Sequence, residues 1–125
     1  MAYKILVIDD DRTVVEMIKA ALVKKQYDVC VAYDGDQGLE QVRNFQPDLI
    51  VLDVMMPTMD GYMFIRTLRA LRVVERQPMM PVIVITAKEG MEEVFKFEGV
   101  KEYLIKPIAP VELLHKIEKC LGSHK

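Results

Sequence analysis

The sequence predicts an α/β domain in which five parallel strands form one sheet covered by helices on both faces. Two observations lead to this prediction. Short apolar runs alternate along the chain with segments whose apolar residues recur at helical spacing, which is the pattern of repeated β–α units. Charged or hydroxyl side chains follow four of the five apolar runs, and the carboxyl ends of parallel strands share one edge of a sheet. The chain has 125 residues, and we expect residues 1–125 to form a single domain.

The predicted strands are short. In chain order they are Lys4–Ile8, Val29–Val31, Leu49–Leu52, Val82–Ile85 and Tyr103–Ile105. The first and third runs have no polar residue in their interior, which is typical of strands that are buried on both faces. We therefore expect these two strands near the middle of the sheet.

The predicted helices occupy the segments between these strands. They follow the acidic cluster at residues 9–11, cover Gln37–Phe45 and Tyr62–Val74, follow Gly90, and run from Pro110 to Leu121. Pro110 is suited to a first helical turn, and Gly122 is suited to the residue after the last turn. The helix after Gly90, marked by Val94 and Phe97, is expected to be short and weak.

The composition excludes several classes of protein. Lysine and arginine total 17 and aspartate and glutamate total 19, so the net charge of −2 argues against a nucleic-acid surface as the main function. The apolar runs are much shorter than a membrane span, which needs about 20 residues. The segment that begins at Met1 has no signal-peptide layout. Cys30 and Cys120 lack the spacing of a zinc site and fit buried or half-buried thiols in a reducing compartment, so we expect a cytoplasmic protein.

Charged and hydroxyl side chains at the strand ends form the candidate site. Asp9, Asp10 and Asp53 would repel one another unless a cation neutralises them, and Mg²⁺ prefers such oxygen ligands. Lys106 and Thr86 could hold phosphate oxygens through an ammonium and a hydroxyl. A carboxylate in such a site can itself attack phosphorus. Any one of these residues alone fits a turn, a cap or a surface charge, but their occurrence together favours phosphate chemistry.

These segments carry a family resemblance. The chain resembles the receiver domain of bacterial two-component response regulators, which has the chemotaxis-type receiver fold. The matching segments are Ile5–Asp10, Asp48–Asp53, Met56–Pro57, Met59–Gly61, Ile85–Ala87, Gly99 and Tyr103–Pro107. The resemblance implies a flavodoxin-like three-layer α/β/α sandwich with strand order 2-1-3-4-5.

The resemblance also implies a role for each site residue. Asp53 would accept a phosphoryl group from a sensor histidine kinase or a phosphotransfer protein. Mg²⁺ would be bound directly by Asp10, Asp53 and the backbone carbonyl of Met55, and by Asp9 through water. Lys106 would contact the phosphoryl group. The domain would thus be a signalling switch that catalyses only its own phosphorylation and dephosphorylation.

Further residues would transmit the change. Thr86 resembles the switch hydroxyl and Tyr103 the switch aromatic, and the Lys106–Pro107 bond is expected to be cis. A downstream effector would bind the surface formed by the last two helices and the strand between them. The domain would act as a monomer or as a phosphorylation-dependent homodimer, without direct contact with nucleic acid or membrane.

Two segments depart in length from the family pattern. The segment from Thr86 to Gly99 is slightly short, so we expect a clipped fourth helix. The segment from Asp60 to Thr86 is somewhat long, with Arg69, Arg72 and Arg76 on its polar side. This polar side is expected to be either a solvated extension of the third helix or a docking surface.

Three other classes of protein share parts of this pattern. Asp9, Asp11 and Thr13 after an apolar strand also fit a haloacid-dehalogenase-type phosphatase with Asp9 as nucleophile, but that interpretation leaves Asp53 unexplained. A flavin-binding domain of similar architecture is disfavoured, because acidic strand ends would repel the flavin phosphate. A receiver-like interaction module that is not phosphorylated is the remaining alternative.

Overall fold

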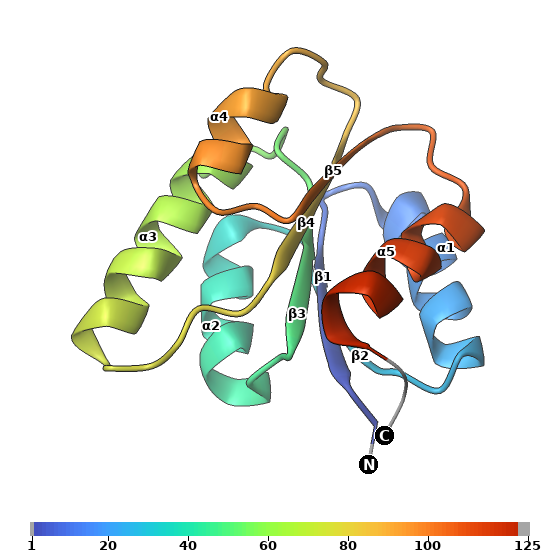
Figure 1. Ribbon diagram of the computed structural model, residues 1–125, viewed down its shortest axis with the longest axis horizontal. Helices are drawn as coiled ribbons and strands as arrows, with labels where there is room; N and C mark the ends of the chain where they lie inside the picture. Colours follow the sequence, from blue (N-terminus) through green and yellow to red (C-terminus); the bar gives the residue numbers. More distant parts are fainter. Residues whose placement is uncertain (1, 123–125) are drawn as a thin grey trace.

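A parallel sheet of five strands forms the middle layer of the computed structural model, which describes residues 2–122 (Figure 1). Met1 and residues 123–125, which belong to the predicted domain, lie outside the described residues. The strands are β1 (Lys4–Ile8), β2 (Asp28–Ala32), β3 (Leu49–Leu52), β4 (Val82–Thr86) and β5 (Glu102–Ile105). The helices are α1 (Arg12–Lys24), α2 (Gly35–Phe45), α3 (Gly61–Val74), α4 (Glu92–Phe97) and α5 (Pro110–Leu121). The strand order β2-β1-β3-β4-β5 confirms the predicted fold.

The helices cover both faces of the sheet and create two separate apolar cores. Helices α1 and α5 lie on one face, and α2, α3 and α4 lie on the other (Figure 1). The side chains of β1 and β3 alternate between the two cores, so that Leu6 and Ile50 join one and Ile5 and Leu49 join the other. Both strands are central and nearly fully buried, as predicted.

The strand register brings the ends of distant segments together. Ile8 of β1 pairs with Leu52 of β3, so the next residues, Asp9 and Asp53, emerge side by side. Further along the same sheet, where β4 and β5 end, the Lys106 N–H donates to the Thr86 carbonyl at 2.7 Å. The predicted convergence of these residues at one sheet edge is therefore confirmed.

Aspartate side chains fix where three helices begin. Asp11 caps α1 by accepting hydrogen bonds from the backbone N–H groups of Thr13 and Val14, and Asp34 and Asp60 cap α2 and α3 in the same way. Asp11 therefore has a structural role within the acidic cluster. Helix α5 begins at Pro110 as predicted.

Helix α4 is only six residues long and has no side-chain cap, which confirms the predicted short helix. Val94 and Phe97, which mark this helix in the sequence, both lie in it, but both are exposed, Phe97 to 89%. Phe95 is the buried residue instead. Its ring packs between Tyr62 of α3 and Tyr103 of β5, with centroid distances of 5.9 Å and 5.8 Å.

A buried carboxylate ties α4 to α3. Glu98, which directly follows α4, accepts hydrogen bonds from Arg69 at 2.8 Å and Arg66 at 3.3 Å, and lies 3.4 Å from the Tyr62 hydroxyl. Arg72 donates to the carbonyl of Pro78 at 3.0 Å. The long third helix is confirmed, and Arg69 and Arg72 on its polar side are partly exposed while also making these specific contacts.

Residues 2–122 include both cysteines of the chain. Neither cysteine forms a disulfide, and Cys30 and Cys120 are both half-buried thiols, as expected. Within that part of the chain, every helix falls short of the length and apolar character needed to cross a membrane.

The Glu98 contacts predict a measurable contribution to stability. Glu98→Gln keeps the side-chain size but removes the charge that the two arginines share, so the free energy of unfolding should fall by about 1–2 kcal/mol. Urea unfolding followed by circular dichroism measures this change. Glu93→Gln, on the exposed side of the same helix, is the matched control and should change stability much less. Equal effects of the two substitutions would remove Glu98 from this role.

Candidate functional site

Three carboxylates cluster at the carboxyl edge of the sheet. Asp9 is fully buried and Asp53 is 4% exposed, whereas Asp10 is exposed. One oxygen from each of the three side chains lies within 4.8 Å of the other two. The structure therefore brings together the three acidic residues that the sequence singles out.

Lys106 lies against the two buried carboxylates. Its Nζ is 2.7 Å from Asp9 Oδ2 and 3.4 Å from Asp53 Oδ2. Burial raises the pKa of Asp9, although the hydrogen bond from Lys106 acts in the opposite direction. Burial alone would lower the pKa of Lys106, but the hydrogen bond to Asp9 and the charge of Asp53 raise it. Lys106 is thus an ammonium held between two carboxylates.

The second oxygen of each buried carboxylate is held by the backbone. Asp9 Oδ1 accepts from the N–H of Asp11 at 2.9 Å, and Asp53 Oδ1 accepts from the N–H of Met55 at 3.2 Å. Both side chains are therefore fixed from two sides, by a backbone amide and by Lys106. The Met55 side chain is 57% exposed, so its backbone is the part that lies next to the site.

Thr86 and Tyr103 both form hydrogen bonds with the backbone of Lys88. Thr86 is fully buried at the end of β4, and its hydroxyl oxygen accepts from the Lys88 N–H at 3.2 Å. The hydroxyl of Tyr103 donates to the Lys88 carbonyl. Burial raises the pKa of Tyr103. These contacts connect the end of β4 to the Tyr103 ring, and from there to Phe95 of α4.

Gly61 is a site-positioning residue to which sequence reasoning gave no role, although it lies in one of the matching segments. A Cβ atom here would lie 2.8 Å from the Val54 Cα and 2.9 Å from the Asp53 carbonyl oxygen. The Gly61 N–H donates to the Val54 carbonyl at 2.8 Å. The absence of a side chain therefore lets the start of α3 rest directly on the segment that carries Asp53.

The donor set fits a divalent cation. Three carboxylates within reach of one another supply the oxygen ligands that Mg²⁺ and similar hard cations prefer. One ammonium, that of Lys106, leaves an excess of negative charge among them. The cluster Asp9, Asp10 and Asp53 is thus consistent with a divalent metal site.

The match to a family model identifies the domain as a phosphoacceptor signalling module rather than a true enzyme, and the parallel sheet with an acidic cluster and a lysine at its carboxyl edge agrees with this. The family model of the response regulator receiver domain matches residues 5–118, and the chain belongs to this family. The domain is therefore the receiver domain of a two-component response regulator, and its acidic pocket is formed by Asp9, Asp10 and Asp53.

Individual relatives agree with this assignment. The chain is 37% identical over 123 residues to the alkaline phosphatase synthesis transcriptional regulatory protein PhoP of Bacillus subtilis, covering 97% of this chain and 49% of that protein. It thus spans about half the length of this relative. Among solved structures, the chemotaxis protein CheY4 of Vibrio cholerae is 27% identical with a TM-score of 0.85, covering 96% of this chain and 99% of that one. A CheY-like receiver domain protein of Methanospirillum hungatei is 29% identical with a TM-score of 0.84, covering 95% and 93%.

The comparisons favour the receiver over the phosphatase alternative. The family match accounts for Asp53, which the phosphatase interpretation leaves unexplained. The Lys106–Pro107 peptide bond is cis, as the resemblance implied.

The close contact at Gly61 predicts a large effect of adding one methyl group. Gly61→Ala should lower the free energy of unfolding by about 2 kcal/mol or more, because the new Cβ would overlap backbone atoms that cannot move independently. Gly90→Ala is the control, since a Cβ there meets no atom within 4 Å and only the φ of 87° opposes it. That strain should cost about 1 kcal/mol. Urea unfolding of both variants tests the idea, and a smaller loss at Gly61 than at Gly90 would contradict it.

Proposed function

We propose that Asp53 is the phosphoacceptor and takes its phosphoryl group from a phosphohistidine of a sensor histidine kinase or phosphotransfer protein. An Asp53 carboxylate oxygen bonds to phosphorus, and the bond from phosphorus to the histidine nitrogen breaks. The nitrogen keeps the electron pair, and the product on this chain is an acyl phosphate. The observation that carries the proposal is the carboxylate of Asp53 held beside buried Asp9 and the Lys106 ammonium.

Mg²⁺ is the metal that we propose for the acidic pocket. Asp9, Asp10, Asp53 and the backbone carbonyl of Met55 would hold it. When bound, the metal supplies positive charge for the phosphoryl oxygens. Lys106 supplies a second positive charge from the chain itself, and its contact with Asp53 supports this role.

We propose that Thr86 and Tyr103 carry the switch. Once Asp53 is phosphorylated, the Thr86 hydroxyl moves to donate a hydrogen bond to a phosphoryl oxygen, its oxygen no longer accepts from the Lys88 N–H, and the Lys88 segment shifts. Tyr103 then changes its burial, because its hydroxyl is bonded to the same residue. The change would reach a downstream effector at the α4–β5–α5 surface by displacing a two-state equilibrium.

The setting of this switch is also a proposal. We place the domain in the cytoplasm, as a monomer or a phosphorylation-dependent homodimer, and assign it no direct contact with nucleic acid or membrane. The cluster of carboxylates at the carboxyl edge of the sheet supports the proposed lack of contact with nucleic acid and membrane, because nucleic acid and anionic lipid both repel negative charge.

Intact-protein mass spectrometry after incubation with acetyl phosphate and Mg²⁺ tests the phosphoacceptor. The wild-type chain should gain one phosphoryl group, and Asp53→Asn should gain none. Asp48→Asn, at the opposite end of the same strand, is the matched control and should be labelled like the wild type. Labelling of Asp53→Asn would sink the assignment.

Further outcomes of that experiment separate the alternatives. Loss of labelling in Asp9→Asn alone, with Asp53→Asn still labelled and a phosphate ester turned over by the wild type, would instead favour the phosphatase. A chain that takes no phosphoryl group from acetyl phosphate or from a histidine kinase would be a receiver-like interaction module.

Lys106→Ala should separate metal binding from switching. Mg²⁺ should bind at least as tightly as in the wild type, because the ammonium that competes for Asp9 and Asp53 is gone. The phosphorylation-dependent shifts of the Tyr103 and α4 amides in NMR spectra should disappear. Lys24→Ala, at an exposed lysine of α1, is the control. Unimpaired switching in Lys106→Ala would remove Lys106 from the mechanism.

A further inference from the structure

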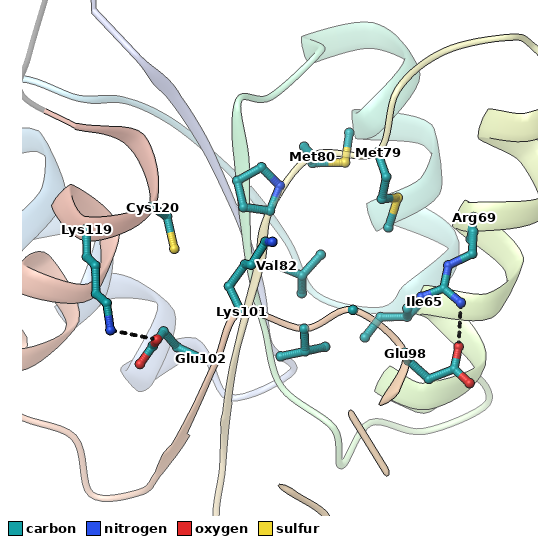
Figure 2. A pocket seen from close by; sticks show the side chains of 13 residues that line it. Ile65, Arg69, Met79, Met80, Val82, Glu98, Lys101, Glu102, Lys119 and Cys120 are labelled. Atoms are coloured by element: carbon teal, nitrogen blue, oxygen red, sulfur yellow. Dashed lines mark hydrogen bonds and ion pairs between the residues drawn. The ribbon is translucent and has the colours of Figure 1, made fainter. Parts of the chain in front are cut away.

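A pocket of about 770 Å³ lies at the opposite end of the sheet from the acidic site. It is formed where β4 and β5 begin, between α3 on one side and the last turn of α5 on the other (Figure 2). The acidic site lies where the same two strands end. The pocket is therefore a separate feature, and its volume is in the range of small-molecule sites.

Apolar and charged side chains both line this basal pocket. Ile65, Met80, Val82 and Val100 are all buried at its lining, and Met79 is 36% exposed at its mouth. The two methionines come from the segment that joins α3 to β4. Methionine side chains are flexible and adapt to apolar ligands of varied shape. The pocket thus offers an adaptable apolar surface.

The rim of the pocket carries a cation that no carboxylate of residues 2–122 neutralises. Glu98 is bonded to Arg69 on the α3 side, and on the α5 side Glu102 is held by Lys116 at 3.0 Å and Lys119 at 3.5 Å. Lys101 makes no ion pair with any described residue, and Figure 2 shows it between these two groups. Since both carboxylates are neutralised by their own cations, the pocket presents a net positive charge to a ligand.

We propose that the basal pocket binds a small amphipathic carboxylate. The apolar chain of the ligand would lie on Met79, Met80 and Val82, and its carboxylate would accept a charge-assisted hydrogen bond from Lys101. A cationic ligand would meet the ammonium of Lys101 without a free carboxylate to balance it. This inference does not depend on the phosphoacceptor role of Asp53, and its test involves no phosphorylation.

Titration of the wild-type chain with octanoate, followed by ¹H–¹⁵N NMR, tests the proposal. The backbone amides of Val82, Val100 and Lys101 should shift and reach saturation, while the amide of Asp53 should not. Octylammonium has the same chain with the opposite charge and should bind at least about tenfold more weakly. Shifts without saturation, or equal binding of the two compounds, would overturn the proposal.

Two variants test the role of the charge. Lys101→Met keeps an apolar stem of similar length and should weaken octanoate binding about tenfold. Lys25→Met, at an exposed lysine that does not line the pocket, should leave binding unchanged. The same loss in both variants, or in neither, would remove Lys101 as the anion-binding residue.

The reactivity of the Cys120 thiol provides an independent test of ligand binding, because Cys120 lines the pocket and is half-buried. Cys30→Ser leaves Cys120 as the single thiol and keeps a donor for the Gln41 side chain. In this background octanoate should slow the alkylation of Cys120 by iodoacetamide at least threefold at saturation. An unchanged rate would place the ligand outside the pocket and contradict the proposal.

Discussion

The structure depends on holding two carboxylates next to each other in a place that water scarcely reaches. Asp9 and Asp53 are almost completely buried, and negative charges so close together are unfavourable without a counter-charge. The strand order brings these carboxylates together, since β1 and β3 are neighbours whose register places both side chains side by side. Lys106 reaches them from two strands further along and supplies the compensating charge. The parallel arrangement thus places two carboxylates that repel each other and the ammonium that compensates them at the same edge of the sheet.

A continuous set of contacts leads from this edge to the outside of the domain. The buried hydroxyl of Thr86 and the hydroxyl of Tyr103 share Lys88, and the Tyr103 ring rests on Phe95. Phe95 in turn packs on Tyr62, whose hydroxyl lies beside Glu98. Because each member touches the next, a displacement at Thr86 has a physical path to α4 and then to α3. The shortness of α4 suits such a path, since a helix of six residues has little stability apart from its tertiary contacts.

The fold and the carboxylate cluster could be predicted because they depend on patterns that are local in sequence. Apolar runs define the strands, and the residue after each run marks the sheet edge, as at Asp9, Asp53 and Lys106. Features that depend on packing between distant segments could not be predicted. Nothing near Glu98 in the sequence indicates that arginines some thirty positions earlier would bind it. In α4 the helix is too short for a periodic pattern, so the buried Phe95 was not distinguished from its exposed apolar neighbours. The basal pocket is likewise a product of three-dimensional packing.

The edge strand β5 affects the tendency of the domain to aggregate. An open sheet exposes unpaired backbone groups along its outer strands, and such edges can pair with those of other molecules and aggregate. Strand β5 is one of these edges and is only four residues long. It starts at Glu102, which lysines of α5 hold in place, and ends at Ile105, two residues before Pro107, which has no N–H to offer. A short edge bounded by fixed charges and a proline is a poor template for a foreign strand, so the chain protects its own solubility at the strand that carries Tyr103.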